Sequence, residues 1–402
     1  MSNKPAIGQP ADGQPADGQP AGGQPAGGQP AGGRRSEGNR GAGGRGARAD
    51  VPNRFEQLHR QPDLSELGEE DAQERLAARP PTLFLSDRSV SLISENRSPD
   101  IPFRYSLNPY RGCEHGCSYC YARPTHEYLG MSAGLDFETK ILVKEQAVRL
   151  LLEELAKPSW EPAPLTLSGV TDPYQPAERQ WRLTRGLLQA LCDCRHPVSL
   201  ITKNALIERD LDLLAAMAED SLVHAAISLT TLDAQLARDM EPRTSTPEAR
   251  LRAIRSLTEA GVPVRVMVAP IVPGLTDHEL PSLLEAAAEA GACCAGYTLL
   301  RLPGAVEPVF REWLAEVRPE AHDRVLAKIR EARGGALNDA TFGRRMRGSG
   351  ERAAQIGNLF KLFSRQYGLA DEPPPQRTDL FVRPSRPGRD RSPADGGQLR
   401  LF

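Results

Sequence analysis

Short apolar runs alternate with amphipathic helical patterns through the middle of this 402-residue chain. The runs are nearly unbroken by charge, which is typical of parallel strands covered on both faces. They are FRYSLNP (103–109), LTLS (165–168), PVSLIT (197–202), HAAISLT (224–230), VPVRVMVA (262–269) and AGYTLLRL (295–302). Helical patterns occur at residues 144–156, 177–193, 206–219, 247–261 and 279–291. About six β–α units predict an α/β fold, either a barrel or an open parallel sheet.

Polar or Gly/Pro-rich positions follow each predicted strand, as in Thr202-Lys203 after the third. A (β/α) barrel carries its chemistry at the carboxyl ends of its strands. We therefore predict a partial six-stranded, TIM-like (β/α) barrel over residues 99–305, with its site at those ends. Residues 306–371 hold further helical patterns, and we expect them to form a C-terminal helical extension.

Both ends of the chain have a different composition from the middle. Residues 8–32 repeat GQPA(D/G), and their period of five excludes collagen. Residues 34–48 are rich in Arg and Gly. Because such segments have little to bury, we expect residues 1–80 and 372–402 to be disordered. The Arg/Gly segment is either a nucleic-acid-binding arm or a flexible solubilising tail.

Three cysteines lie within eight residues in CEHGCSYC (113–120). Zinc sites usually take four protein ligands from paired C-x₂-C modules, and the chain has no second such module. His115 is poorly spaced to complete a tetrahedron, and a redox C-x-x-C pair would leave Cys113 unexplained. Three thiolates on a tight loop suit a four-iron cluster in which one iron has no protein ligand.

The stretch SLNPYRGCEHGCSYCYAR (106–123) resembles the CxxxCxxC signature of the radical S-adenosylmethionine (SAM) superfamily. It is most similar to the spore photoproduct lyase-like, or DNA repair photolyase-like, branch. The resemblance implies that Cys113, Cys117 and Cys120 hold a [4Fe-4S] cluster whose open iron binds SAM. It further implies that a one-electron reductant drives SAM cleavage and that the resulting radical abstracts hydrogen from a substrate.

The resemblance also implies SAM-binding roles for residues at the ends of predicted strands. Tyr119, which precedes the third cysteine, is expected near the adenine. Lys203 is similar to a lysine that contacts the SAM carboxylate, a task that suits an ammonium group. Ser228 is similar to a serine near the ribose. For each residue, the alternative is an ordinary polar side chain at a strand end.

The segment after the second predicted strand is similar to the one that receives the SAM amino group. Its residues here are Ser168, Gly169 and Thr171. Asp172 and Glu178 lie in the same loop. They either contact SAM or substrate or only brace the loop.

Spore photoproduct lyase also uses a further cysteine as hydrogen donor. The remaining cysteines of this chain, Cys192, Cys194, Cys293 and Cys294, do not match that cysteine by position. We expect them to be small buried apolar residues. The lyase reaction itself therefore stays open.

The chain ends in QLRLF, which resembles the Gln-Leu-x-Leu-Phe peptide that binds the bacterial sliding clamp. A flexible tether would present the apolar anchors Leu399, Leu401 and Phe402, with Gln398, to a shallow pocket. Alternatively, Leu401 and Phe402 fold back onto the protein's own surface.

Three functions remain open. The first is a radical SAM enzyme that acts on a nucleic acid, such as damaged DNA. The second keeps this chemistry but acts on RNA, protein or a small molecule. The third is a non-catalytic, metal-stabilised protein that binds nucleic acid or the clamp.

The net charge of −2 excludes a uniformly basic protein. Without a secretory signal or an apolar run of about 20 residues, we expect a cytoplasmic protein with no membrane partner.

Overall fold

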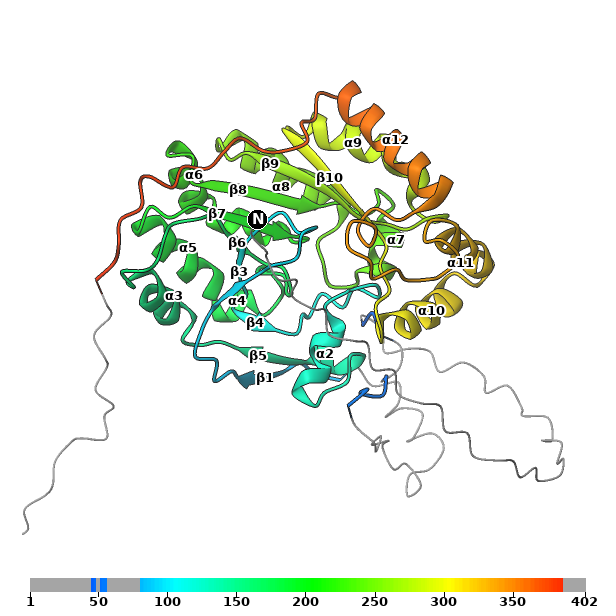
Figure 1. The fold of residues 1–402 in the computed structure, drawn as a ribbon, viewed down its shortest axis with the longest axis horizontal. Helices are drawn as coiled ribbons and strands as arrows, with labels where there is room; N and C mark the ends of the chain where they lie inside the picture. Colours follow the sequence, from blue (N-terminus) through cyan, green and yellow to red (C-terminus); the bar gives the residue numbers. More distant parts are fainter. Residues whose placement is uncertain (1–44, 48–50, 56–79, 386–402) are drawn as a thin grey trace, which may run out of the picture. The chain divides into compact units, whose positions relative to one another are not determined.

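The structure, a computed structural model, describes residues 45–47, 51–55 and 80–385. All of them belong to the unit Arg40–Phe402. Its centre is a seven-stranded sheet in the order β10-β9-β8-β7-β6-β3-β2 (Figure 1). The strands are β2 (Ile93–Glu95), β3 (Tyr105–Leu107), β6 (Leu165–Leu167), β7 (Val198–Thr202), β8 (Val223–Ser228), β9 (Val264–Ile271) and β10 (Cys294–Leu299).

Six of these strands pair in parallel, which confirms the predicted α/β fold of the partial barrel type. Leu165 of β6 lies opposite both Tyr105 of β3 and Val198 of β7, so neighbouring strands are in step. The residues that follow the parallel strands therefore form one border of the sheet, here called the carboxyl edge; the opposite border is the amino edge. The added strand β2 is antiparallel to β3 and is only three residues long, too short to carry a periodic signal.

Helices connect the strands and cover the outer face of the sheet (Figure 1). They are α3 (Ala147–Leu155), α4 (Glu178–Trp181), α5 (Leu183–Asp193), η3 (Ala205–Asp210), α6 (Leu211–Glu219), α7 (Ala234–Met240), α8 (Pro247–Glu259), η4 (Asp277–Glu279) and α9 (Leu280–Glu289). The helix predicted over 177–193 is broken at Arg182, whose φ of 51° is left-handed. Leu, Ile and Val side chains from both layers form the main core.

A second, three-stranded sheet in the order β1-β5-β4 lies beside the barrel. Its strands are β1 (Leu83–Ser86), β5 (Lys140–Val143) and β4 (Tyr110–Arg111). Between β4 and β5 lie the cysteines, the short helices η1 (Arg123–Thr125) and η2 (Glu127–Leu129), and α2 (Leu135–Thr139). Sequence patterns did not predict this sheet, because its strands are short and are paired across long separations in the chain.

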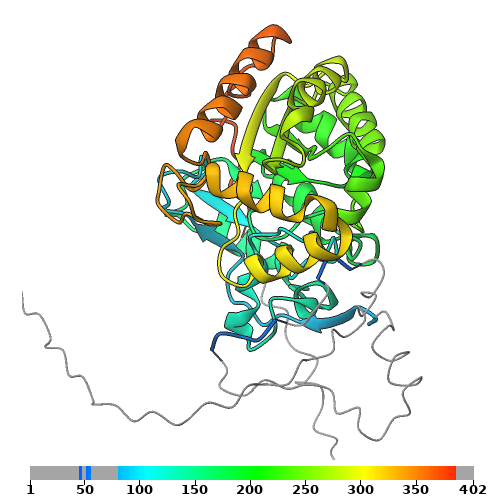
Figure 2. The same ribbon diagram turned by 90° about the vertical axis from the view of Figure 1, so that its right-hand side faces the viewer.

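The C-terminal helical extension packs on the remaining side of the barrel (Figure 2). It contains α10 (Val306–Val317), η5 (Pro319–Ala321), α11 (His322–Glu331) and α12 (Gly350–Gln366). Helices α10 and α11 share a second core with Tyr119 of the cysteine loop. Helix α12 covers the edge strand β10, where Phe360 packs on Tyr297 with ring centroids 4.6 Å apart. In the part of the chain that the structure describes, no helix is long and apolar enough to cross a membrane.

The expected disorder of the tails is wrong where the structure describes them. After α12, the chain runs along the amino edge, and Gln376 donates to the carbonyls of Val198 (2.7 Å) and Leu222 (2.9 Å). The N–H of Val382 donates to the carbonyl of Cys194 (2.8 Å). Two pieces of the N-terminal region, 45–47 and 51–55, also pack on the protein, as described below. The GQPA repeats and the QLRLF peptide lie outside the described residues.

Candidate active site

The cysteine loop, residues 113–120, begins directly after β4 and lies at the carboxyl edge of the sheet. Its backbone is held from two sides. The N–H of Ser118 donates to the carbonyl of Met240 at 3.0 Å. The fully buried Arg123 donates from Nε and Nη2 to the carbonyl of Cys117, at 3.1 and 2.8 Å. The loop is therefore fixed by the protein itself.

The three thiols of this loop are gathered in a buried place. Cys113 and Cys117 are each 7% exposed. Burial raises the pKa of all three thiols. The charge of Asp172 raises the pKa of Cys113 further, and the charge of Glu241 raises that of Cys117, whereas Lys203 lowers the pKa of Cys117 and Arg123 lowers that of Cys120. Three thiolates held so close need a cationic partner. The loop therefore brings together a donor set that calls for a metal group.

The number of thiols favours a cluster over a single ion. A structural zinc site usually takes four protein ligands, whereas this loop supplies three cysteines. A zinc ion needs its ligands to converge on one point. In a [4Fe-4S] cluster, each cysteine ligates a different iron, so the sulfurs stand further apart. The three cysteines therefore fit a cluster with one iron left open.

Lys203 extends from the end of β7 toward the cysteine loop. Its Nζ lies 5.6 Å from the centroid of the Tyr119 ring and 3.2 Å from Oε1 of Glu241. It also donates to the carbonyl of Ala269 at 2.9 Å. Burial, followed by the charge of Arg250, lowers the pKa of Lys203 to about 8. A partly buried ammonium thus stands near Cys117 and Cys120.

Glu241 lies under Lys203, and its side chain is fully buried. It accepts hydrogen bonds from the Tyr119 hydroxyl and from Nη2 of Arg250. Thr230 donates its hydroxyl to Oε1 at 2.7 Å. Lys203, Arg250 and Glu241 therefore form a buried group with one carboxylate and two cations. This group keeps a positive charge close to the cysteines.

Asp172 connects the loop after β6 to the end of β7. It accepts from the Thr202 hydroxyl (2.7 Å) and the Lys203 N–H (2.8 Å), and its Oδ2 lies 3.4 Å from Nδ1 of His115. Although burial opposes the shift, the charge of His115 and these hydrogen bonds lower the pKa of Asp172. Asp172 therefore braces the site. Glu178 is likewise buried, and it accepts from the side chains of Tyr110 and Arg209.

The segment after β6 turns sharply at the carboxyl edge. Ser168 and Gly169 have φ values of 150° and 106°, a region that suits glycine and strains serine. The carbonyl of Gly169 accepts from the Tyr121 hydroxyl at 2.7 Å. Thr171 is nearly buried, and its N–H donates to Oδ1 of Asn108 at 3.0 Å. The strained turn places this segment against the residue that follows the third cysteine.

Ser228 ends β8 on the same edge. It is buried, and its carbonyl accepts from Nη1 of Arg250 at 3.0 Å. The structure thus gathers most of the predicted positions at one end of the sheet. The SAM contacts of Tyr119, Lys203 and Ser228 stay predictions.

The sequence did not indicate Glu241 or Arg250. Arg250 lies in α8, in a stretch with many surface-type charges, and Glu241 follows α7 without a motif. Helix α8 begins where Thr246 caps it through a hydrogen bond to the Ala249 N–H, with Pro247 in the first turn. This start directs Arg250 inward, which only the tertiary structure reveals.

Three arginines lie near one another beyond the end of β10, and we call Arg301, Arg333 and Arg345 the arginine rim. Arg301 follows β10, and its guanidinium lies 5.8 Å from the ring centroid of Tyr121. Among the described residues, its Nε has no hydrogen-bond partner. Burial, and then the charge of Arg345, lowers the pKa of Arg301. Burial, and then Arg301, lowers the pKa of Arg333 to about 10.

Arg345 links the segment before α12 to the β2–β3 loop. It forms a two-pronged ion pair with Asp100 from the β2–β3 loop, at 2.8 and 2.5 Å. Its guanidinium stacks on Phe342 at 4.7 Å. Phe342 and Tyr121 are 58% and 52% exposed.

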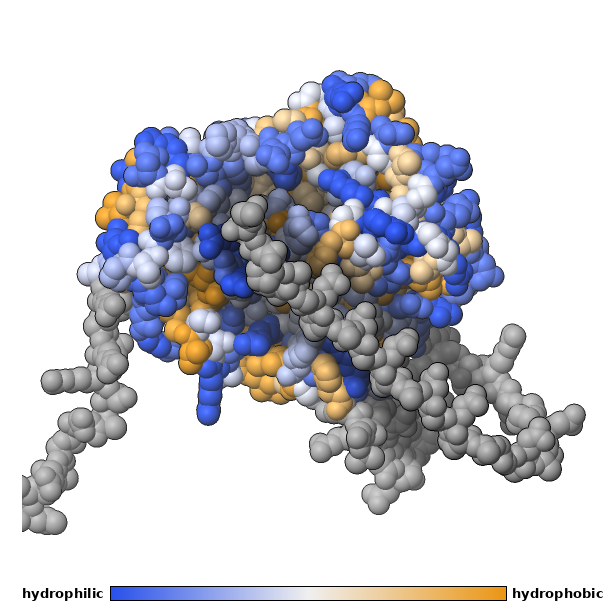
Figure 3. Space-filling view, in the orientation of Figure 1, coloured by the Kyte–Doolittle hydropathy of each residue, from blue (hydrophilic) through white to orange (hydrophobic). Residues whose placement is uncertain are grey.

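Figure 3 shows that hydrophilic side chains predominate on the face drawn in Figure 1, with apolar ones scattered among them.

Comparisons with known proteins agree with this geometry. Residues 107–287 match the model of the radical SAM superfamily. An uncharacterized protein of Mycobacterium tuberculosis (strain ATCC 25618 / H37Rv) is 44% identical over 226 residues, which cover 56% of this chain and 66% of the relative. An uncharacterized protein of Methanocaldococcus jannaschii is 31% identical over 176 residues, covering 44% and 63%. The chain thus spans slightly less than two thirds of these curated relatives.

Solved structures of spore photoproduct lyase have a similar fold. A mutant with bound AdoMet and dinucleoside spore photoproduct superposes with a TM-score of 0.52 and 17% identity, covering 78% of this chain and 87% of the lyase. Such low identity supports the fold alone. Members of the matched superfamily use a [4Fe-4S] cluster and SAM, and the cysteine loop fits that cluster. The cysteine loop and the partial barrel agree with this match, so residues 107–287 form a radical SAM superfamily domain.

Proposed function

We propose that this protein is a radical SAM enzyme that abstracts a hydrogen atom from a nucleic-acid substrate, with DNA as the first candidate. When bound, the cluster supplies the electron that cleaves SAM to methionine and a 5′-deoxyadenosyl radical, which takes a hydrogen atom from the substrate. The electron comes from a one-electron reductant. The products of this step are 5′-deoxyadenosine and a substrate radical.

The chain's own residues bind and orient the participants. Cys113, Cys117 and Cys120 hold the cluster. Lys203 donates a hydrogen bond to the SAM carboxylate. To do so, its ammonium group must release one of the oxygen atoms that it contacts now. Glu241 is the acceptor it can release, because Arg250 and Tyr119 still satisfy that carboxylate. The buried position of Lys203 strengthens its attraction for a carboxylate.

The arginine rim carries the assignment of the substrate class. Arg301 and Arg345 place cationic groups beside the exposed rings of Tyr121 and Phe342. Single-stranded or flipped-out nucleotides are recognised by this combination, since bases stack on aromatic faces while guanidinium groups bind phosphates. Tyr121 directly follows Cys120 in the sequence, so a base stacked on its ring would lie next to the cysteines that hold the cluster.

The test is hydrogen transfer from labelled DNA. The reconstituted protein is incubated anaerobically with reductant, SAM and DNA deuterated at its bases and sugars. We expect deuterium in 5′-deoxyadenosine, detected by mass spectrometry. If 5′-deoxyadenosine forms at the same rate with and without DNA and contains no deuterium, DNA is not the substrate. The same assay with deuterated RNA then tests the alternative nucleic acid.

A further inference from the structure

Gly46, in the Arg/Gly-rich N-terminal region, packs directly on the cysteine loop. A Cβ built on Gly46 would lie 1.5 Å from the carbonyl oxygen of Gly116 and 3.1 Å from the N of Ser118. Gly116 directly precedes Cys117. Real side chains do not approach a backbone atom so closely, so only glycine fits at position 46. The N-terminal region therefore contacts the backbone of the cluster-binding loop.

Arg45 and Ala47 anchor this contact on either side. Arg45 is 6% exposed and donates to the carbonyls of Glu138 (3.0 Å) and Pro80 (2.9 Å) and to the Thr82 hydroxyl (3.2 Å). Burying a guanidinium is costly unless its N–H groups are satisfied. Arg45 meets that requirement with three acceptors. The segment is thus built into the protein and differs from a solvated basic arm.

The carboxylate of Glu138 joins this segment to Cys117. It accepts from the N–H groups of Gly46 (3.0 Å) and Ala47 (2.7 Å), and from Nη2 of Arg123. Arg123 in turn holds the carbonyl of Cys117. Glu138 and Arg123 are both fully buried. A continuous set of hydrogen bonds therefore runs from the N-terminal backbone to the middle cysteine.

The second described piece of the N-terminal region holds the chain that follows the cysteines. Asn53 donates to the carbonyls of Glu127 (3.0 Å) and Met131 (3.1 Å). Arg54 pairs with Glu127 at 3.2 Å. The Ser132 hydroxyl donates to the carbonyl of Val51 at 2.7 Å. These contacts fix the segment from η2 to α2, which carries Glu138 at its end.

We propose that residues 45–47 and 51–55, here called the N-terminal strap, are a positioning element of the cluster site. The strap fixes Glu138, Glu138 orients Arg123, and Arg123 holds the cysteine loop in its ligating shape. This role concerns cluster retention and applies whatever the substrate is. It also assigns part of the Arg/Gly-rich region to the protein's own active site.

Hydrogen bonds that hold metal-ligating residues in place without touching the metal orient those residues. Their loss typically weakens metal binding about 10- to 100-fold. Without the strap, two N–H donors leave the Glu138 carboxylate and the Gly116–Ser118 backbone becomes uncovered. The cysteine loop then samples shapes that release iron. The strap supplies no ligand, so cluster assembly remains possible in its absence.

The main experiment compares two truncations of the full chain. Removing residues 1–39 deletes the separate N-terminal unit and leaves the strap, whereas removing residues 1–48 also deletes Arg45–Ala47. After anaerobic reconstitution, iron release to a ferrous chelator and the cluster midpoint potential are measured. We expect the shorter chain to release iron at least about tenfold faster and to show a shifted potential. Equal release rates and potentials would overturn the proposal.

A point substitution provides a second test that leaves the chain length unchanged. Gly46→Ala places a methyl group against the Gly116 carbonyl, so it should reproduce the faster iron release. The matched control is Gly186→Ala in α5, where the added Cβ meets only the end of the Val148 side chain. The control should release iron at the wild-type rate. Wild-type behaviour of Gly46→Ala would contradict the account.

A peptide added in trans separates positioning from misfolding. A synthetic peptide of residues 45–55 is added to the chain that lacks residues 1–48. We expect it to slow iron release toward the wild-type rate, because the contacts do not require a covalent link. Failure of the peptide to slow release, together with loss of helical circular dichroism in the truncated chain, would make the strap a folding element only. A change in DNA affinity with unchanged iron release would support the nucleic-acid arm instead.

Discussion

The two edges of the central sheet both carry cysteines, but in different surroundings. At the carboxyl edge, three cysteines lie beside Lys203 and the buried pair of Glu241 and Arg250. At the amino edge, Cys294 begins β10, and Cys194 ends α5 within the apolar core. Burial alone therefore does not distinguish the site, since both sets contain buried thiols.

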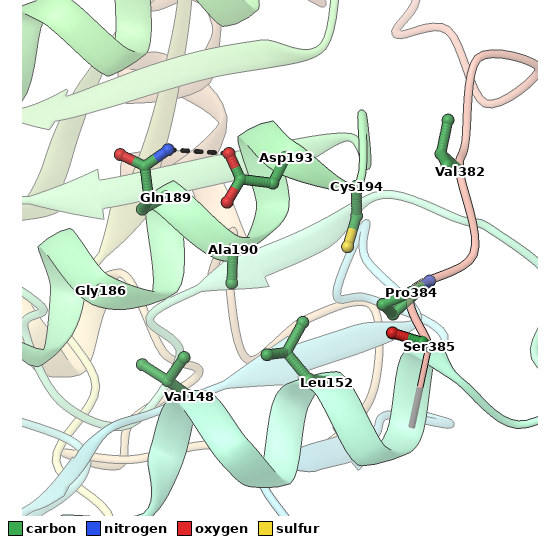
Figure 4. Close-up of a pocket in the computed structure, with 10 residues that line it drawn as sticks. All are labelled: Val148, Leu152, Gly186, Gln189, Ala190, Asp193, Cys194, Val382, Pro384 and Ser385. Carbon is green, nitrogen blue, oxygen red and sulfur yellow. Dashed lines mark hydrogen bonds between the residues drawn. The ribbon is translucent and has the colours of Figure 1, made fainter. Parts of the chain in front are cut away.

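The amino side also has a cavity, of about 360 Å³ (Figure 4). It lies between α3, α5 and the C-terminal segment, and the aliphatic Val148, Leu152 and Val382 line it beside Cys194. Its carboxylate, Asp193, already accepts from Gln189 at 2.8 Å. This cavity therefore lacks converging charged groups. A candidate active site is therefore better indicated by several titratable groups held in contact with one another than by a buried thiol or a cavity alone.

The largest expected effect separates the two sets of cysteines. Changing Cys113, Cys117 or Cys120 to alanine removes a cluster ligand, so we expect loss of the reconstituted iron and of SAM cleavage. The Cys192→Ala and Cys293→Ala variants should keep both the iron and SAM cleavage, because these residues lie toward the amino edge of the sheet. Iron and sulfide analysis with absorption spectra checks this. Loss of iron from the Cys293→Ala variant would contradict the prediction that only the cysteine loop holds the cluster.

The next effect concerns the buried ammonium at the carboxyl edge. Lys203→Met should weaken SAM binding at least tenfold, since a hydrogen bond to a charged group contributes roughly 1.5–3 kcal/mol. Lys144 is a matched control, because burial also lowers its pKa, but the charged groups near it are Asp87 and Arg111. Equilibrium binding of SAM to both variants measures the effect. Equal affinities would remove Lys203 from the SAM site.

The arginine rim is expected to have a smaller, salt-dependent effect. Arg301→Gln should weaken binding of single-stranded DNA and lower the slope of log affinity against log salt by about 1. Arg347 is the control, because it stacks on Tyr297 at 4.1 Å beside α12. Fluorescence anisotropy at several salt concentrations gives both slopes. An unchanged slope for Arg301→Gln would exclude a phosphate contact there.

The smallest effect on function is expected at the amino edge, where the charge state of His196 matters for stability alone. Nε2 of His196 accepts from Trp160 (3.2 Å) and Nδ1 lies 3.0 Å from the Pro197 carbonyl, so the neutral ring is fully satisfied. Burial lowers the pKa of His196 to about 4. Its stabilising contribution is complete above pH 6.5 and is lost as the pH falls toward 4.

We expect this group to lower the free energy of unfolding by about 2 kcal/mol between pH 7.5 and pH 5. Urea unfolding followed by tryptophan fluorescence at both pH values measures this loss. A His196→Gln variant should show a smaller pH dependence, because it has no ring to protonate. The same dependence in both proteins would assign the effect to other groups. SAM affinity at pH 7.5 should not differ between them.

Periodicity predicted the six parallel strands, and local spacing predicted the cysteine loop, because both signals lie within short stretches of sequence. The pairing of Glu241 with Arg250 and Lys203 depends on where α7 and α8 lie in space, so no local pattern indicates it. The strap and residues 372–385 were mistaken for disordered tails, since their composition is polar and rich in Gly or Pro. Their order comes from contacts such as Gly46 on Gly116, which require the folded partner.

The central claim is that the cysteine loop holds a [4Fe-4S] cluster that cleaves SAM. The most direct measurement is anaerobic reconstitution of the full chain, followed by reduction in the presence of SAM and quantification of iron and 5′-deoxyadenosine. We expect about four irons per chain and formation of 5′-deoxyadenosine that depends on the reductant and on Cys117. A chain that binds zinc alone, or binds iron but forms no 5′-deoxyadenosine, would contradict it.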